Sequence, residues 1–482
     1  MVDKGLLVDM ADYAERERRA RLSADVIHHA KRAVIDCFAA LLAGGNDPPA
    51  TLLARAFGDS IGHGKALLYP SGRKAPLRLA ALINATAAHT AEFDDIFRDA
   101  IYHPGAPTIP AALAAAQSRG ADGMAFLRAV VVGYEISTRI GLALGRPHYR
   151  YWHTTATVGT FGSAAAVATL LGLDRMQFAH ALATAATMAA GLQQAFRSEA
   201  MSKPLHAGHA AEAGALAAVA AGEGVTGALD VLDGAAGLGA AMAGGTDWSG
   251  TVVGLGRDYN ITQMTFKNHG CCGHSFAAID AILALRAAHN LTAEKISKIT
   301  VRTYKTALDV TGSYKVTTSF EGRFSLPYVA ATALVHGRVR IDAFEPKRLA
   351  DPAVRALMQK VELAVDPVLD AGFPGQRAAH VEIATTDGRQ LRHEQPTRKG
   401  DPDLPLSDDE LSDKLLELAS PAVGAAQARR LLQRLWSLDR AGGAAMAIES
   451  ACSARRGHQT ERRRSPSKPK QPKRTRKTGS SR

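Results

Sequence analysis

The sequence predicts a mainly α-helical protein, with a large all-helical domain and a smaller α+β domain. Apolar residues make up 46% of the chain and aromatic residues only 6%. The apolar residues are mostly Ala, Leu and Val, which suits closely packed helices. Helical apolar spacing recurs through the first half of the chain, whereas strand-like alternation is confined to part of the second half. A chain of 482 residues is long enough to form two such domains.

Residues 1–260 are predicted to form the first part of the helical domain. Glycine and proline clusters, such as Gly44-Gly45 and Pro48-Pro49, mark the connections between its helices. Apolar spacing or an Ala-rich composition predicts these helices at Ala30–Leu42, Leu77–His89, Ile109–Gln117, Ala125–Leu144, Gly162–Leu171, Met176–Ala190 and Ala207–Ala221.

Residues 261–400 are predicted to form the smaller α+β domain. Two helices are expected there, at Phe276–Ala288 and Pro327–His336. Asp387-Gly388 is a strong β-hairpin signal between two short alternating segments. The alternation predicts strands at Ile296–Tyr304, His380–Ala384 and Gln390–His393.

Helices return in residues 401–450, which we expect to pack back on the helical domain. Ser407 and Glu410 have the spacing of a capping box, which opens a helix through about Leu418. A second helix is predicted at Ala422–Leu438.

Residues 451–482 are predicted to be a disordered basic tail. The net charge of the chain is +12, and residues 455–482 hold twelve Lys and Arg against one Glu. The tail therefore carries +11 of this charge, and the globular part is near neutral. Such a tail can contact nucleic acid or anionic lipid. Because no aromatic or glycine-rich binding motif accompanies the charge, we favour a non-functional extension without such a partner.

Cysteine usage and the N-terminus predict a cytoplasmic location. Four cysteines in so long a chain favour a reducing compartment, and the charged first 21 residues lack the apolar stretch of a secretory signal. Two uncharged runs, residues 152–173 and 178–196, are long enough to suggest membrane spans. Both are rich in Gly, Ala and Thr and contain His or Gln, which favours central helices of a soluble bundle.

Lys203 precedes Pro204 at the start of a predicted helix. Proline suits the first helical position, and the free amide groups and helix dipole there favour an anion. Lys203 and the nearby His206 are therefore candidates to bind a substrate carboxylate. A solvated lysine before an ordinary helix is the alternative.

An acid-rich loop follows the helix predicted at Leu77–His89. Glu92, Asp94 and Asp95, with His103 a few residues on, are the residue types of a metal site or of a general acid–base pair. A helix end with solvated acids is the alternative.

His153 stands with Thr154 and Thr155 before an uncharged, apolar segment. A neutral imidazole and two hydroxyls can donate to a carboxylate, or the imidazole can serve as a base. A capping cluster with one core histidine is the alternative.

Lys267 opens a segment with four potential zinc ligands at the predicted domain junction. Adjacent cysteines cannot easily both reach one tetrahedral ion, and no second CxxC is present, so no metal is expected. The four potential ligands are His269, Cys271, Cys272 and His274.

The inventory of histidines, lysines and acids suits proton abstraction beside a carboxylate, with elimination, decarboxylation or epimerisation as the outcome. No GxxxxGK[ST] or GxSxG motif appears, and no GxGxxG follows a strand, so no cofactor is evident. Two other classes stay open. A metal-dependent hydrolase would use the acid loop and residues 267–274, and a non-catalytic binder of nucleic acid or membrane would act through the tail.

Together these segments resemble the MmgE/PrpD family of 2-methylcitrate dehydratase and cis-aconitate decarboxylase over roughly residues 5–450. The motifs that carry the resemblance are Leu82-Ile83-Asn84-Ala85, His89-Thr90-Ala91-Glu92-Phe93-Asp94-Asp95, His103-Pro104, Gly133-Tyr134-Glu135, His153-Thr154-Thr155, Phe161-Gly162, Lys203-Pro204-Leu205-His206, Lys267 with Cys272, and Ser325-Leu326-Pro327-Tyr328.

The resemblance implies that the smaller domain is a lid, that the protein is a homodimer, and that it needs no cofactor. It also implies small di- or tricarboxylate substrates. Glu92 departs from the family, whose members commonly have aspartate there, and Phe276 stands where a histidine is usual, with His274 two positions earlier. The implied active-site positions are Glu92, Asp94, Asp95, His103, His153, Lys203, Lys267 and Tyr328.

We therefore expect a cofactor-independent lyase with 2-methylcitrate dehydratase-like activity. Cis-aconitate decarboxylase-like and iminodisuccinate epimerase-like activities are the alternatives. His103 or His153 is expected to move the proton, with Asp94 and Asp95 in the catalytic set, and Tyr328 to donate to the leaving group or to the developing enolate. The expected substrate-binding residues are Glu92, Lys203, His206, Lys267, His269 and His274.

Overall fold

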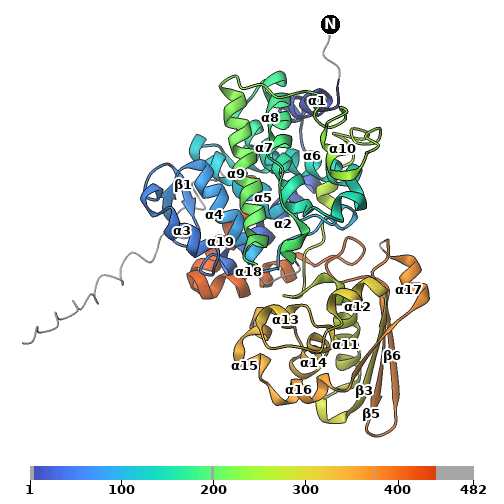
Figure 1. The fold of residues 1–482 in the computed structure, drawn as a ribbon. Coiled ribbons are helices and arrows are strands. Elements are labelled where there is room, and N and C mark those ends of the chain that lie inside the picture. The colour runs from blue at the N-terminus through green and yellow to red at the C-terminus, as the bar shows by residue number, and fades with distance from the viewer. Residues whose placement is uncertain (1–4, 197–199, 374, 441–482) are drawn as a thin grey trace, which may run out of the picture.

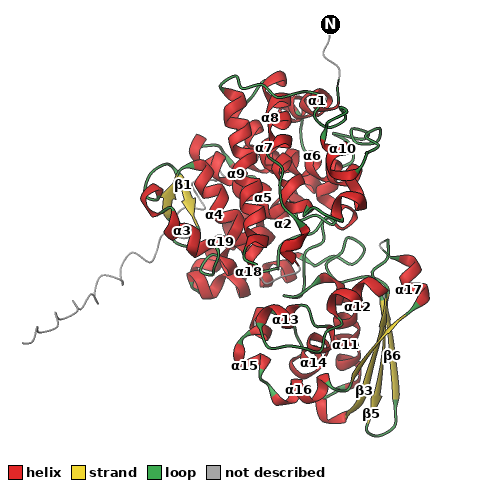
Figure 2. Cartoon of the chain, in the orientation of Figure 1, coloured by secondary structure: helices red, strands yellow, loops and turns green. Residues whose placement is uncertain are grey.

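The computed structural model describes residues 5–196, 200–373 and 375–440. They form a large helical part and a smaller α+β part (Figure 1). The chain builds most of the helical part first, enters the α+β part near residue 270 and returns to the helical part after residue 400. The prediction of a mainly α-helical protein is confirmed, and the strands are short (Figure 2).

The helical part begins with a series of helices interrupted by one small hairpin. The hairpin pairs β1 (Ala66–Leu68) with β2 (Arg73–Ala75) in antiparallel fashion. The helices are α1 (Leu6–Arg19), α2 (Ala24–Gly44), α3 (Ala50–Ala56), α4 (Leu77–Thr90), α5 (Gly105–Arg119), α6 (Gly123–Tyr149), α7 (Thr154–Leu171), α8 (Arg175–Thr187), α9 (Ser202–Gly222) and α10 (Leu238–Ala243).

Helix α7 lies at the centre of the helical part, in contact with α5, α6, α8 and α9. Small residues permit this close packing. A Cβ atom on Gly214 of α9 would lie 2.4 Å from the Thr160 carbonyl oxygen of α7, so only glycine fits there. Among the described residues, α7 is the helix whose length and composition would allow it to span a membrane, and 89% of it is buried inside the protein. That burial is also what the sequence predicted for a central helix.

The α+β part is built on a four-stranded sheet in the order β4-β3-β5-β6. Strand β3 (Ile296–Thr303) is parallel to β4 (Val361–Val365) and antiparallel to β5 (Ala379–Thr385), which pairs with β6 (Gln390–Gln395). Its helices are α11 (Phe276–His289), α12 (Lys305–Thr311), α13 (Ser319–Arg323), α14 (Leu326–His336), α15 (Pro346–Leu349), α16 (Pro352–Met358) and α17 (Pro367–Gly372).

Helices α11 and α14 pack against the sheet and form a second apolar core with it. Buried and partly buried residues alternate along the whole of β5, as a strand with one covered face requires. Gly388, with a φ of 87°, supplies the left-handed residue of the β5–β6 turn. The predicted hairpin is therefore confirmed.

Two final helices, α18 (Asp408–Val423) and α19 (Ala425–Trp436), pack on α2 of the helical part. The Ser407 side chain accepts a hydrogen bond from the Glu410 backbone, and the Glu410 side chain bonds back, so the capping box is present. Residues 451–482, predicted to be a basic tail, lie outside the described residues.

Several elements differ from the prediction. Helix α7 begins at Thr154 rather than Gly162, because its first turns are buried on every side and show no amphipathic spacing. Helix α9 begins at Ser202, so Pro204 is its third residue and not its first. Strand β4 was missed, because it is short and only its first residue is buried.

Candidate active site

A cavity of about 620 Å³ lies between the helical part and the α+β part. Glu92, His103 and Lys203 line it from the helical part, and His274 and Arg377 line it from the other. Its remaining walls contain charged, polar and apolar residues, which are Ile96, Ile101, Tyr149, Gln193, Lys267, Cys272, Gly273, Thr306, Asp309, Val310, Phe320, Phe324 and Arg398.

The acid loop, residues 91–104, connects α4 to α5 and brings Glu92 to the cavity wall. Glu92 has a φ of 56°, a left-handed conformation that costs energy in a non-glycine residue. The Lys414 ammonium of α18 donates to the Phe93 carbonyl oxygen (2.8 Å) and pairs with the buried Asp36 carboxylate (2.5 Å). A helix far along the chain thus holds this loop in place.

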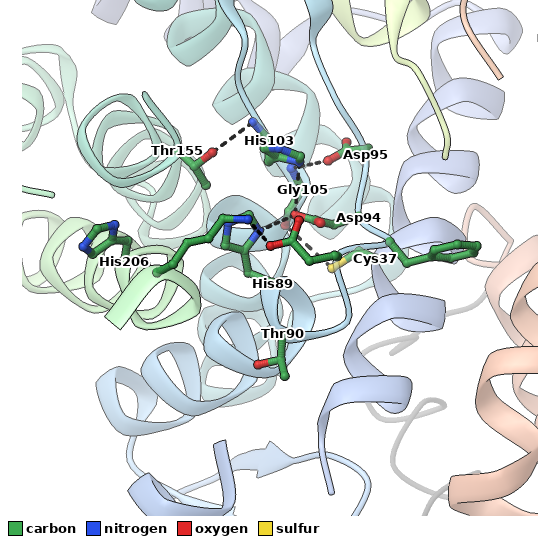
Figure 3. Close-up of polar contacts among 12 residues, drawn as sticks. Cys37, His89, Thr90, Asp94, Asp95, His103, Gly105, Thr155 and His206 are labelled. Carbon is green, nitrogen blue, oxygen red and sulfur yellow. Dashed lines mark hydrogen bonds and ion pairs between the residues drawn. The ribbon is translucent and has the colours of Figure 1, made fainter. Parts of the chain in front are cut away.

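Asp94 lies between two imidazoles, those of His89 and His103 (Figure 3). Its Oδ2 atom is 2.7 Å from His89 Nδ1 and 3.3 Å from His103 Nδ1. Burial disfavours the charged carboxylate, but His89, His103 and Lys267 outweigh it and lower the pKa of Asp94. Asp94 is therefore an anion that can orient His103 and stabilise its charged form.

His103 is the imidazole of this group that reaches the cavity. Its side chain is 18% exposed, whereas that of His89 is fully buried. Its backbone amide donates to the Thr155 hydroxyl (3.2 Å), which fixes the start of the segment leading into α5. Burial lowers the pKa of His103, and Asp94 opposes this shift. An imidazole that is held by a carboxylate can transfer protons.

Lys203 and Lys267 both contact Glu92. The Lys203 ammonium pairs with Glu92 Oε1. The Lys267 ammonium donates to the Glu92 carbonyl oxygen (2.8 Å) and lies 3.7 Å from both Glu92 Oε2 and Asp94 Oδ1. Burial opposes ionisation of Glu92, but these two lysines outweigh it and lower the pKa of the carboxyl well below its usual value.

His153 and His206 lie behind the cavity wall. The His153 ring stacks on His89 with 5.4 Å between centroids, and its Nδ1 is 3.1 Å from His206 Nδ1. Burial lowers the pKa of His153 well below its usual value and that of His206 to about 4. Both rings are thus neutral at pH 7. Of His103 and His153, the two predicted proton-transfer residues, only His103 lines the cavity.

Residues 8–251 of the chain match the MmgE/PrpD N-terminal domain, and residues 269–438 match the MmgE/PrpD C-terminal domain. The chain belongs to the MmgE/PrpD family. The resemblance noted from the motifs is thereby confirmed. The matched C-terminal domain includes α18 and α19, which pack on the helical part.

Curated relatives in the MmgE/PrpD family carry decarboxylase names. The cis-aconitate decarboxylase-like protein oryM of Aspergillus oryzae is 28% identical over 463 residues, covering 89% of this chain and 94% of that protein. Human cis-aconitate decarboxylase is 32% identical over 364 residues, covering 72% and 73%. The mouse cis-aconitate decarboxylase is 28% identical over 366 residues, covering 72% of each.

Two positions that the MmgE/PrpD resemblance marked lie outside the cavity lining. The Tyr328 hydroxyl lies inside the α+β part and donates to the Ala343 carbonyl oxygen (2.5 Å), away from the cavity lining. Asp95 accepts from the Gly105 amide (2.9 Å) and the Tyr134 hydroxyl (2.7 Å). Burial and the charge of Asp36 raise the pKa of Asp95 to about 8. These side chains hold the fold around the site.

The two histidines of residues 265–274 also differ in their positions relative to the cavity. His269 Nε2 is 2.8 Å from Asp280 Oδ1, and the other oxygen of Asp280 accepts from the Lys399 amide. His269, predicted to bind substrate, therefore contacts Asp280 and does not line the cavity. His274 does line it, with Nδ1 2.7 Å from the Tyr304 hydroxyl. Burial, Arg377 and Arg398 lower the pKa of His274 to about 3.

One group of metal-type ligands occurs among residues 5–196, 200–373 and 375–440. The ligand atoms of His89, Asp94 and His103 lie within 4.8 Å of one another. The Lys267 ammonium is already 3.7 Å from Asp94, and a positive charge there repels a second cation. The arrangement suits proton transfer better than metal binding.

Sequence reasoning missed several cavity residues. Arg377 and Tyr149 belong to no motif, and Arg377 lies in the connection before β5. Sequence reasoning also missed the buried ion pair of Asp36 and Lys414, which lie 378 positions apart in the chain. The only sequence signal for Lys414 was a lysine within a helix that begins with acidic residues.

Proposed function

We propose that this protein is a lyase that transfers a proton on a small di- or tricarboxylate, and that the reaction is decarboxylation of a cis-aconitate-like acid. The observation that carries this proposal is His103, held by Asp94 at the wall of a cavity that also contains Lys203 and Lys267. A cavity of about 620 Å³ is of the size that holds small ligands.

Decarboxylation of cis-aconitate requires two things from the protein, which are positive charge near the substrate and one proton. In cis-aconitate, the bond to the carboxylate on the methylene carbon breaks, and carbon dioxide leaves. The electron pair left behind forms a new double bond with the neighbouring carbon, and the original double bond shifts its electrons to the vinylic carbon. That carbon takes a proton from His103, which solvent then reprotonates.

The surrounding groups supply electrostatic stabilisation for this step. The Lys267 ammonium lies beside Asp94 and Glu92, where it can favour negative charge that develops on the substrate. Asp94 stabilises the protonated imidazole of His103. The names of the curated relatives favour decarboxylation over 2-methylcitrate dehydration, which the sequence suggested first.

Substrate turnover by the purified full chain tests this proposal. We expect carbon dioxide release from cis-aconitate, with no new double bond formed from 2-methylcitrate. Turnover of 2-methylcitrate alone would make the protein a hydro-lyase and overturn the decarboxylase assignment. Absence of any reaction with cis-aconitate, 2-methylcitrate or aminodicarboxylates would overturn the lyase proposal itself. Independence of a cofactor, the homodimer and the cytoplasmic location stay predictions of the sequence.

A further inference from the structure

We propose that Arg377 binds a carboxylate of the substrate at the wall of the cavity formed by the α+β part. The inference rests on the proposed function for the chemical class of the substrate. It adds a recognition residue that belongs to none of the motifs in this chain.

Arg377 differs from the other cationic residues of the cavity lining in its ion pairs. Lys203 and Lys267 contact Glu92. Arg398 donates two hydrogen bonds to the Asp401 carboxylate, at 2.9 and 2.6 Å. Among the described residues, Arg377 is the one cation in the lining without an ion pair to a carboxylate.

Arg377 is nevertheless buried, with 8% of its surface exposed. One guanidinium nitrogen donates to the Arg98 carbonyl oxygen (3.2 Å), and the buried Nε atom has no hydrogen-bond partner. Burial, with Arg398 nearby, lowers the pKa of Arg377 to about 10, so it stays charged at neutral pH. The charge of Asp401 acts on Arg377, and the Phe373 ring centroid lies 5.8 Å from the guanidinium carbon. No carboxylate of the described residues is within ion-pair distance, so an entering anion would stabilise this buried cation.

The neighbours of Arg377 provide further donors. Burial raises the pKa of Tyr304 to about 12, so its hydroxyl keeps its proton and can donate it to His274 Nδ1. The neutral His274 ring then carries its proton on Nε2, as inferred from this hydrogen bond. Arg377 and His274 line the same cavity, and a guanidinium can bind a carboxylate with two parallel hydrogen bonds.

In this proposal the two parts of the protein contact different groups of the substrate. The helical part supplies His103, Asp94 and Lys203, which act at the reacting carbon. The α+β part supplies Arg377, which binds a carboxylate that does not react. Glu92 already neutralises the two lysines in part, whereas Arg377 offers an entering acid a positive charge that forms no ion pair with a described carboxylate.

Calorimetric titration of the full chain with non-reacting acids tests the proposal. Tricarballylate has three carboxylates, glutarate lacks the central one, and 2-ethylsuccinate lacks a terminal one. We expect Arg377→Gln to weaken tricarballylate binding about 30-fold or more, the effect of truncating one partner of a buried charge pair. Arg377→Lys should recover part of the loss, because it keeps the charge without the two parallel hydrogen bonds.

One of the two smaller acids should identify the carboxylate that Arg377 binds. For that acid, Arg377→Gln should change the affinity by no more than a few-fold, since the interaction is already absent. Arg302→Gln, an exposed arginine on β3 of the same sheet, is the matched control and should bind all three acids like the wild type. Far-ultraviolet circular dichroism should be unchanged in Arg377→Gln, and its thermal midpoint should be no lower than that of the wild type.

Several results would overturn the inference. The first is that Arg377→Gln binds tricarballylate with wild-type affinity, and the second is that this variant loses the same affinity for all three acids. The third is that the wild type binds none of the acids. The fourth is that inorganic phosphate binds more tightly than tricarballylate and that this binding depends on Arg377. Arg377-dependent binding without any turnover would instead overturn the proposed function alone. Normal turnover by Arg377→Gln would overturn only the inference.

Discussion

His103 and Asp94 are the residues on which the proposed chemistry depends. The carboxylate lies 3.3 Å from the imidazole of a histidine that reaches the cavity, and burial and charge keep that carboxylate ionised. Lys267 lies on its other side. The same three residues would serve decarboxylation or dehydration, and the direction of proton movement distinguishes the two reactions.

Replacement of His103 by glutamine should remove the proton donor while keeping a polar side chain of similar size. We expect kcat for cis-aconitate to fall by ~10²–10⁴-fold, the usual contribution of a positioned general acid. His289→Gln, at the exposed end of α11, is the matched control and should keep wild-type kcat. A His103→Gln enzyme within a few-fold of the wild type would show that another group moves the proton.

The pH dependence should show which way the proton moves. Burial lowers the pKa of His103 below its usual 6.5, so the charged, proton-donating form becomes scarcer as the pH rises. For decarboxylation we therefore expect kcat/KM to decrease steadily from about pH 6 to about pH 8. A base would need the neutral ring, and kcat/KM would then fall toward acid instead. The profile for cis-aconitate decides between them.

Local sequence could predict some of the site but not all of it. Lys203, Lys267, Asp94 and His103 stand in recognisable motifs. The structure places the two lysines and His103 in the lining of one cavity, with Asp94 buried beside them. Tyr328 stands in such a motif too, yet its hydroxyl points into the α+β core, because side-chain direction depends on packing that a motif does not encode. Arg377 reaches the cavity from a connection without any motif, so only the fold reveals it.

Helix α18 has a role beyond packing, because it holds the acid loop. Lys414 is fully buried and connects this helix to Asp36 of α2 and to the carbonyl oxygen of Phe93. Phe93 lies between Glu92 and Asp94, so a shift there would move both acids. The geometry of the active site therefore depends on a helix near the end of the described chain.

Replacement of Lys414 by methionine should test this link. The change leaves the Asp36 carboxylate buried without its partner, and we expect a loss of about 3–5 kcal/mol in the free energy of unfolding. The double variant with Asp36→Asn should recover much of that stability, because the uncompensated charge is gone. It should keep a reduced kcat, since the Phe93 carbonyl is no longer held.

Urea unfolding and kcat for cis-aconitate measure the two effects of Lys414. Unfolding free energies of Lys414→Met and the wild type within about 1 kcal/mol would contradict the stability argument. A double variant with wild-type kcat would contradict the positioning argument.

Element types were easier to predict than their boundaries. The helices and the β5–β6 hairpin follow from spacing, capping and turn residues, all of which are local. The beginning of α7 was missed because a helix buried on all sides has no amphipathic pattern. Strand β4 was missed because its place in the sheet comes from parallel pairing with β3, more than fifty residues earlier.

The whole molecule joins two apolar cores around one cavity. One core contains the early helices together with α18 and α19, and the other belongs to the sheet with α11 and α14. The chain therefore crosses between the parts twice, and the residues of both crossings lie near the cavity, with Lys267 at the first and Arg398 at the second. A ligand that contacts both parts would stabilise the folded protein as a unit.

Deletion of residues 455–482 tests whether the basic tail belongs to the function. This segment carries most of the net positive charge, whereas the cavity is lined by residues 92–398. We expect the shortened chain to keep wild-type kcat/KM for cis-aconitate and to lose any salt-dependent binding to a polyanion such as heparin. A large loss of activity would show that the tail contributes to catalysis.

The central claim is that His103 gives a proton to an acid that loses carbon dioxide in this cavity. Proton nuclear magnetic resonance of cis-aconitate with the enzyme in deuterium oxide tests it directly. We predict that the substrate signals disappear, that carbon dioxide is released, and that the product carries one deuterium on the former vinylic carbon, with His103→Gln nearly inactive. Unchanged cis-aconitate, a product without deuterium, or equal turnover by His103→Gln would contradict the account.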